Sequence, residues 1–418
     1  KKESSRWVIF PRLAFQNHKV IVARNEALSD TLSDYKKNMI FPASDHCASK
    51  RKGIATGGIS FTYAMEARQE LGDLKLMKIT TPYPFPEKKA LEFLQGLDEV
   101  LCLEELDPVI EKELIHICGK YGLSTRIAGK LSHHVRCAGE NSRDSVLADM
   151  AAFMGVSTKK QPMPDLPPLP VRPPGLCAGC PHRASFYAVK KAMKGRKTIF
   201  CGDIGCYTLG NAMPLDMVDT CLCMGAGIGI AQGVARLDPD TRCFAFVGDS
   251  TFFASAIPGV INALYNQAEM TLIVLDNSTT AMTGHQPHPG TGKTLMGQNV
   301  QPVSMENVLK GIGVKHVTAV DPLNHSKAVD AVREAADLPG VKAIIFRSPC
   351  IALVKPGAAL RVDAPSCIGC QRCIREIGCP AMSICEGKVN IDSRQCTGCG
   401  LCSTLCPVKA IGGGDHAG

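Results

Sequence analysis

Residues 243–250 read CFAFVGDS, and residues 270–277 read MTLIVLDN. Each stretch is a short apolar run that ends in polar residues, which is typical of a strand buried on both faces of a parallel sheet. We expect the two strands to be neighbours, so Asp249 and Asn277 would lie together at their carboxyl ends. Ligands of open α/β sheets bind at that edge. The side-chain oxygens of both residues suit a Mg²⁺ ion whose other ligands are phosphate oxygens.

Strand and helix patterns alternate on both sides of this pair. Strands are expected at 53–56, 74–79, 99–103 and 124–127, and again at 198–201, 243–247, 270–275 and 341–346. Helices are expected between them at 60–70, 87–97, 107–121, 182–194, 225–236, 252–266 and 325–337. This alternation predicts an α/β protein with two parallel-sheet domains.

The predicted domains are separated by a change in composition. Seven prolines fall within residues 161–174, which is typical of an extended, semi-rigid linker. The expected organisation is a connector at 1–47, an α/β domain at 48–160, a Pro-rich linker at 161–175, a second α/β domain at 176–360 and a small cysteine-rich domain at 361–413.

Small residues surround the first of the two predicted strand ends. Gly248 and Ser250 flank Asp249, and the stretch 224–229, MGAGIG, opens a predicted helix. Gly225 and Gly227 would let the backbone come close to a cofactor, and a helix N-terminus favours anions. Ordinary strand-end turns and helix packing also use glycine in this way, so that alternative stays open.

Cysteine is the most informative residue type, with 21 in 418 residues and nine of them between 367 and 406. Two runs have the spacing C-x2-C-x2-C followed by a Cys-Pro pair. In two-cluster ferredoxins the cysteine before proline ligates the other cluster. The first predicted [4Fe–4S] ligand set is therefore Cys367, Cys370, Cys373 and Cys406, and the second is Cys396, Cys399, Cys402 and Cys379.

Zinc is the alternative for these cysteines, but it prefers two separated C-x2-C pairs around one tetrahedral ion. The first run has five residues between Cys373 and Cys379, against three in the second run, and Cys385 falls outside both sets. Iron–sulfur clusters need a reducing compartment, so we expect an anaerobic, cytoplasmic setting and a role in electron transport.

Charge and hydropathy exclude other classes. Lys and Arg number 47 against 39 Asp and Glu, a net charge of +8, and residues 1–52 hold 11 basic against 5 acidic side chains. No nucleic-acid recognition motif accompanies this basic segment, so no nucleic-acid partner is expected. No apolar run approaches the roughly 20 residues of a membrane helix, so no membrane partner is expected either.

Four motifs resemble the α subunit of the indolepyruvate:ferredoxin oxidoreductases, in the 2-oxoacid:ferredoxin oxidoreductase family. They are LCAGCPHR at 176–183, GDIGCYTLG at 202–210, GDSTFF at 248–253 and DNSTTAMTGHQ at 276–286. Asn277 follows Asp249 by 28 positions, which resembles the thiamine-diphosphate motif G-D-G…N with Ser250 in place of the last glycine. The resemblance covers about residues 48–413.

The resemblance implies a transketolase C-terminal-like domain, then a domain that binds thiamine diphosphate, then a small α+β two-cluster ferredoxin domain. It implies that aryl pyruvates are oxidatively decarboxylated with coenzyme A to aryl-acetyl-CoA and CO2, with electrons passing to ferredoxin. A smaller β subunit is the implied partner. Mg²⁺ would be held by Asp249, Asn277 and the carbonyl oxygen of Thr279. The family's pyrimidine-binding domain, which carries an activating glutamate, has no counterpart in residues 1–47 and is expected to be missing or separately encoded.

The resemblance also implies a third [4Fe–4S] cluster beside thiamine. Its ligands would be Cys177, Cys180, Cys206 and Cys350. The alternative is that these four are structural thiols, as expected for Cys201, Cys221, Cys223 and Cys243. His182, His285 and Gln286 are the candidates for polar catalytic contacts in the pocket.

Two other functions remain open at this point. The first is oxidation of another 2-oxoacid, such as pyruvate. The second is a non-catalytic iron–sulfur subunit that transfers electrons and has a vestigial thiamine site.

Overall fold

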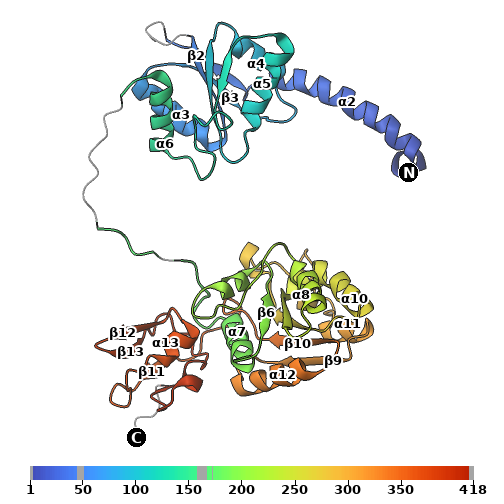
Figure 1. The fold of residues 1–418 in the computed structure, drawn as a ribbon, viewed down its shortest axis with the longest axis vertical. Helices are drawn as coiled ribbons and strands as arrows, with labels where there is room; N and C mark the ends of the chain where they lie inside the picture. Colours follow the sequence, from blue (N-terminus) through green and yellow to red (C-terminus); the bar gives the residue numbers. More distant parts are fainter. Residues whose placement is uncertain (1–2, 45–50, 158–166, 172, 414–418) are drawn as a thin grey trace. The chain divides into compact units, whose positions relative to one another are not determined.

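The computed structural model describes residues 3–44, 51–157, 167–171 and 173–413. The chain forms two compact units, Lys1–Pro168 and Leu169–Gly418, which are described separately (Figure 1). Residues 161–166 and 172 of the predicted linker 161–175 lie outside the described residues, and the described part of it forms neither helix nor strand.

The first unit is a five-stranded sheet in the order β1-β3-β2-β4-β5. Its strands are β1 (Met39–Phe41), β2 (Lys52–Gly57), β3 (Lys75–Ile79), β4 (Glu99–Leu103) and β5 (Arg126–Ala128). Strands β2 to β5 are parallel, as predicted, but β1 runs antiparallel to β3 and was not predicted.

Alternating side chains of these strands bury both faces of the sheet. Ile54, Leu76 and Leu101 pack under α3 (Gly58–Leu71) and α6 (Arg143–Met154). The residues next to them on the strands pack under α4 (Glu87–Leu94) and α5 (Val109–Tyr121) on the opposite face. The period of two in a strand produces this division.

A long helix occupies about half of the predicted connector 1–47. After the short α1 (Ser4–Trp7), helix α2 covers Pro11–Ser33. Only its last turns touch the domain, where Ser29 Oγ donates to the carbonyl oxygen of Phe85 and Ser33 is buried. The helix needs no apolar stripe because most of it is exposed, which explains why the sequence shows no clean helical period there.

The second unit contains an all-parallel sheet in the order β6-β7-β8-β10-β9. Its strands are β6 (Thr198–Cys201), β7 (Arg242–Gly248), β8 (Met270–Asp276), β9 (His316–Val320) and β10 (Val341–Arg347). Helices α7 (Pro181–Ala192) and α12 (His325–Asp337) cover one face. Helices α8 (Ala226–Leu237), α10 (Ile257–Tyr265) and α11 (Met305–Gly311) cover the other.

The predicted helix 252–266 is not continuous. A short turn, α9 (Asp249–Thr251), leads into a π-helical turn, η2 (Phe252–Ala256), before α10 begins. Pro258 lies in the first turn of α10 and has no N–H to donate, so a regular α-helical bond cannot form there. The wider π-turn accommodates this local loss of hydrogen bonding.

The cysteine-rich segment packs onto α7 as part of the second unit (Figure 1). It contains two small antiparallel pairs, β11 (Leu360–Val362) with β14 (Ile411–Gly413) and β12 (Met382–Cys385) with β13 (Lys388–Ile391). Between them lie α13 (Arg372–Ile377) and the 3-10 turn η5 (Ser403–Leu405). Ile377, Leu401 and Leu405 join the same apolar core as Phe186 of α7. The fold class is therefore confirmed as two parallel-sheet α/β domains and a small α+β segment.

Within the described residues, every helix is too short or too polar to cross a membrane.

Helix α8 comes unusually close to the end of β6. A Cβ atom added at Gly227 would lie 2.6 Å from the carbonyl oxygen of Gly202, whereas one added at Gly229 would meet nothing within 4 Å. We predict that Gly227→Ala destabilises the protein by about 1–3 kcal/mol because backbone must move. Gly229→Ala, in the same helix, is predicted to stabilise it by about 0.5–1 kcal/mol. Thermal unfolding of the two variants checks this, and equal melting temperatures would contradict the close approach.

Candidate functional site

A cavity lies at the carboxyl ends of β7 and β8. These strands are direct neighbours, with Val247 paired to Val274, so Asp249 and Asn277 meet at one edge of the sheet as predicted. We name this the strand-end cavity; its walls include His182, Ile204, Cys206, Tyr207, Met224, Asp249, Ser250, Thr251, Asn277, Thr279 and Met282.

Backbone amides fix the Asp249 carboxylate in place. Oδ1 accepts from the amide of Ser250 at 2.7 Å. Oδ2 accepts from the amides of Asn277 and Thr279 at 3.1 and 3.2 Å. The turn that follows Gly248 and the loop that follows β8 therefore hold one carboxylate between them, and its side chain is almost completely buried.

Three oxygens converge here: Oδ2 of the Asp249 carboxylate, the side-chain oxygen of Asn277 and the carbonyl oxygen of Thr279. The side-chain oxygen of Asn277 lies 3.2 Å from Asp249 Oδ2 and 2.7 Å from the carbonyl oxygen of Thr279, with no hydrogen between them. Rotating the amide would turn these contacts into hydrogen bonds, but a cation would satisfy them as they stand. Adjacent ligands of octahedral Mg²⁺, each at about 2.1 Å, are about 3 Å apart. These three oxygens therefore fit the predicted Mg²⁺ ligands.

His182 supports this arrangement of Asn277. Its Nε2 lies 3.2 Å from Asn277 Nδ2. Burial lowers the pKa of His182 to about 4, against a smaller raising effect of the Asp249 charge, so the ring is neutral at pH 7. A neutral ring nitrogen can accept the amide proton, which turns the amide oxygen toward Asp249. The structure thus places this catalytic candidate where it orients the Asn277 side chain.

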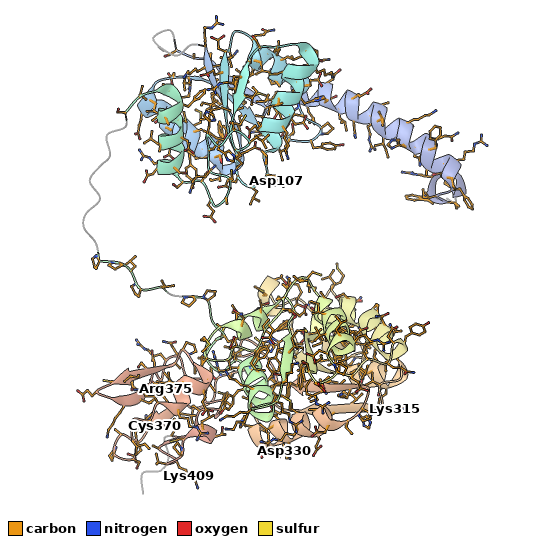
Figure 2. All side chains as sticks on the ribbon, in the orientation of Figure 1. Asp107, Lys315, Asp330, Cys370, Arg375 and Lys409 are labelled. Atoms are coloured by element: carbon orange, nitrogen blue, oxygen red, sulfur yellow. The ribbon has the colours of Figure 1, made fainter. Side chains whose placement is uncertain are left out.

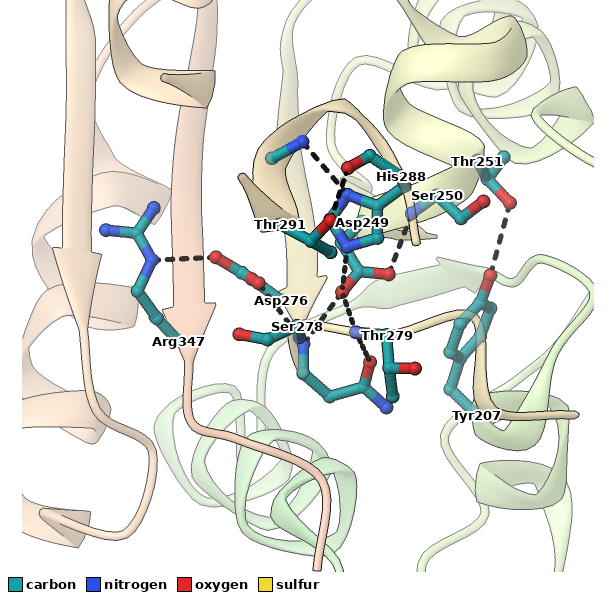
Figure 3. Close-up of polar contacts among 12 residues, drawn as sticks. Tyr207, Asp249, Ser250, Thr251, Asp276, Ser278, Thr279, His288, Thr291 and Arg347 are labelled. Carbon is teal, nitrogen blue, oxygen red and sulfur yellow. Dashed lines mark hydrogen bonds and ion pairs between the residues drawn. The ribbon is translucent and has the colours of Figure 1, made fainter. Parts of the chain in front are cut away.

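The other two candidates, His285 and Gln286, do not line the cavity. Both are exposed, and the Gln286 side chain bonds back to Thr283. His288 in the same loop was not predicted, and its Nε2 lies 3.1 Å from Asp249 Oδ2 (Figure 3). His288 Nδ1 accepts from the amide of Gly290, so the proton is on Nε2 and faces the carboxylate. The sequence holds no signal that separates His288 from His285.

A buried carboxylate, also missed in the sequence, organises the glycine-rich helix start. Asp203 Oδ1 accepts from the amide of Gly225 at 2.9 Å, and its Oδ2 accepts from the Tyr207 hydroxyl at 2.9 Å. Tyr207 also lies 3.3 Å from the Thr251 hydroxyl (Figure 3). Gly225 has a positive φ of 84°, so glycine suits this turn. Gly227 packs against the end of β6 and does not line the cavity.

The clustered cysteines surround two further cavities. Cys379, Cys396, Cys399 and Cys402 line one, together with Cys180 and Arg183 from the sheet domain. We name it the inner cysteine cavity. Cys367, Cys370, Cys373 and Cys406 line the other, which we name the outer cysteine cavity. The structure thus brings together both of the predicted ligand sets, including the exchange of Cys379 and Cys406 between the runs.

Among the described residues, no three His, Cys, Asp or Glu side chains are placed to hold one metal ion. Cys385 lies outside both cavities, exposed on the β12–β13 hairpin.

The predicted third set lies between the strand-end cavity and the inner cysteine cavity. The Cys180 amide donates to the carbonyl oxygen of Cys177 at 3.2 Å. Burial raises the pKa of Cys206, and the nearby Cys350 and Cys177 raise it further. The Cys350 amide donates to the carbonyl oxygen of Asn277 at 2.9 Å. Cys206 lines the strand-end cavity and Cys180 lines the inner cysteine cavity, so the set connects the two.

Two family models match the second unit. Residues 203–346 match the model described as "Thiamine pyrophosphate enzyme, C-terminal TPP binding domain". Residues 389–412 match the model described as "4Fe-4S binding domain". The strand-end cavity and part of the cysteine-rich segment fall within these matches.

Curated relatives match nearly the whole chain. Indolepyruvate oxidoreductase subunit IorA of Methanothermobacter thermautotrophicus is 36% identical over 98% of this chain and 67% of the relative. The subunit of the same name from Methanothermobacter marburgensis is 39% identical over 86% of this chain and 59% of the relative. This chain therefore spans about three fifths to two thirds of the length of these relatives.

Among solved structures, the 2-oxoglutarate:ferredoxin oxidoreductase from Magnetococcus marinus aligns at a TM-score of 0.37 and 20% identity, over 43% of this chain and 66% of that chain. The 36% identity over two thirds of the length of the Methanothermobacter thermautotrophicus subunit shows to which family this chain belongs. The chain belongs to the family of indolepyruvate oxidoreductase subunit IorA.

Proposed function

We propose that this chain is the thiamine-diphosphate- and iron–sulfur-binding part of an enzyme that oxidatively decarboxylates aryl pyruvates such as indolepyruvate. The products are an aryl-acetyl-CoA and CO2, and the electrons pass through [4Fe–4S] clusters to ferredoxin. The observation that carries this proposal is the convergence of the Asp249, Asn277 and Thr279 oxygens beside Cys206.

Mg²⁺ would be held by those three oxygens and would carry the diphosphate of the cofactor. Bound thiamine diphosphate would supply an electron sink for the loss of CO2. His182 contacts the side chain of Asn277, and His288 contacts that of Asp249, so the two histidines would hold these groups in position. Gly248 and Ser250 form the turn that presents the carboxylate.

The walls of the strand-end cavity support an aryl side chain on the substrate. Ile204, Met224 and Met282 contribute apolar surface at the cavity and are partly exposed to solvent. Such surface suits an indole or phenyl ring and offers no cation for a second carboxylate. Another 2-oxoacid such as pyruvate remains the alternative within this class.

The cysteine sets would form a relay in a definite order. Cys206 lies at the strand-end cavity, and Cys180 of the same set lies at the inner cysteine cavity. Cys402 of the inner cavity and Cys373 of the outer cavity are close enough for one thiolate to influence the other. Cys370 of the outer cavity is exposed (Figure 2). Electrons would thus travel from the thiamine side through the inner to the outer cluster, and then to ferredoxin.

The activity requires further protein groups. The residues that line the strand-end cavity include no glutamate, although family members use one to activate the cofactor. We propose that this glutamate comes from outside the described residues and that a smaller β subunit completes the enzyme. A reducing, cytoplasmic compartment suits the proposed clusters.

The carboxylate of Asp249 tests the thiamine site. Asp249→Ala removes a charged ligand, so we expect Mg²⁺-dependent binding of thiamine diphosphate to weaken by more than about 100-fold. Asp276→Asn is the matched control, because Asp276 pairs with Arg347 instead of facing the cavity. Titration calorimetry of both variants measures the effect. Unchanged affinity in Asp249→Ala would contradict the assignment and favour a vestigial thiamine site in an electron-transfer subunit.

The metal content tests the three ligand sets. We expect about twelve iron and twelve acid-labile sulfide per chain for three clusters, against about eight for two. Cys206→Ser should remove about four of each if the third set holds a cluster. Cys385→Ser, outside all three sets, should leave the content unchanged. Anaerobic iron and sulfide analysis measures both, and about eight in the unmodified chain would reduce the sets to two.

A substrate panel tests the aryl preference. With the complete enzyme, coenzyme A and ferredoxin, we expect kcat/KM for indolepyruvate and phenylpyruvate to exceed that for pyruvate by at least about 100-fold, because the ring buries apolar surface. Equal values, or a preference for pyruvate, would replace the aryl assignment with the alternative substrate. Met282→Ala should lower the value for indolepyruvate more than that for pyruvate.

A further inference from the structure

Arg183 is a buried cation in the first turn of α7. Among the described residues, its side chain bonds only to backbone carbonyl oxygens: Nη1 donates to Ile377 at 2.7 Å, and Nη2 donates to Leu176 and, at 3.3 Å, to Cys177. The residue is 5% exposed. A guanidinium removed from water is expensive unless an anion balances its charge.

Cysteine sulfurs are the candidate anions around Arg183. Arg183 lines the inner cysteine cavity, and its Nε is buried without a hydrogen-bond partner among the described residues. Burial lowers the pKa of Arg183, and the groups that oppose this effect are Cys379, Cys180, Cys399 and Cys177. Two of them belong to the inner ligand set and two to the third set. The free N–H and the charge are thus both directed to the proposed clusters.

We propose that the buried charge of Arg183 raises the reduction potential of the cluster in the inner cysteine cavity. This inference rests on the proposed function. A cluster bound by four thiolates is an anion, and reduction adds one electron and one negative charge with no bond made or broken. A fixed, buried cation stabilises the reduced form more than the oxidised form. A hydrogen bond from Nε to a cluster sulfur would act in the same direction.

Because of the position of Arg183, the raised potential would favour electron transfer in one direction. Its guanidinium bridges the carbonyl oxygen of Cys177, in the third set, and that of Ile377, beside Cys379 of the inner set. The thiamine-side centre loses one electron in each transfer and the inner cluster gains it. Raising the potential of the acceptor draws that electron away from the thiamine side and opposes its return.

The test compares Arg183→Met and Arg183→Lys with Arg375→Met in the full chain with its clusters assembled. Arg375 lies on α13, between Cys373 and Cys379 in the sequence. Its side chain is exposed, so solvent and salt screen its charge (Figure 2). Redox titration followed by electron paramagnetic resonance measures the ratio of reduced to oxidised cluster at a fixed potential. In Arg183→Met we expect this ratio to fall at least tenfold for one cluster, a shift of about 59 mV to lower potential. Arg375→Met should leave every cluster unchanged.

Arg183→Lys separates charge from packing. It keeps the positive charge but not the planar fork, so we expect it to restore the ratio to within about threefold of the unmodified chain. A shift as large as that of Arg183→Met would overturn the electrostatic role. If Arg183→Met does not assemble the inner cluster, Arg183→Gln, which retains an N–H donor for Ile377, carries the same comparison.

The outcomes for the inference and for the proposed function are distinct. An unmodified chain without iron and sulfide would contradict the proposed function. A chain with its clusters in place and an unshifted potential in the neutral Arg183 variants would overturn only the role of Arg183.

Discussion

The parallel pairing of β7 with β8 is the constraint on which the strand-end cavity depends. The register pairs Gly248 with Leu275, so the two chains leave the sheet side by side. The loop after β8 can then direct two amides at the Asp249 carboxylate. A slip by one residue would exchange the faces of the strand and turn Asp249 away. The adjacent residue illustrates this dependence on register: Asp276 directly precedes Asn277, yet its side chain pairs with Arg347 of β10.

The first turn of α7 serves the strand-end cavity and the inner cysteine cavity at once. Consecutive residues of an α-helix point about 100° apart, so neighbours in the sequence face different surroundings. His182 reaches Asn277, whereas Arg183 reaches the carbonyl oxygen of Ile377 in the cysteine-rich segment. Cys180, at the N-terminal end of the same helix, lines the inner cavity. The four residues CPHR at 180–183 therefore hold the proposed thiamine and iron–sulfur sites in a fixed relation.

The sequence revealed the parts of the site that have a strong local pattern. Buried parallel strands are continuous apolar runs, so β7 and β8 and the polar residues that follow them could be predicted. The cysteine spacing and its exchanged fourth ligand are equally local. Strand β9 was missed because it is an edge strand whose residues are mostly exposed, without an apolar run.

Other features depend on long-range packing and could not be predicted. His288 contacts Asp249 across 39 positions of sequence, whereas His285, three positions earlier, is exposed. The role of Asp203 is visible only in the structure, where its carboxylate accepts hydrogen bonds from the Gly225 amide and the Tyr207 hydroxyl. Helix α2 gave no pattern because only its last turns contact the domain.

The cysteine-rich segment also depends on packing against residues far away in the sequence. A segment of this size cannot bury a sufficient apolar core by itself, so small domains of this kind use metals or docking for stability. Ile377 and Leu401 complete a core whose other half is the face of α7 and the sheet behind it. The inner cysteine cavity lies at this junction, with Gly179 and Arg183 on one wall and Cys399 on the other. Ligation of a cluster there would stabilise the docked arrangement by its own binding free energy, since only the docked form presents the complete wall. Electron transfer and domain packing would thus depend on the same contacts.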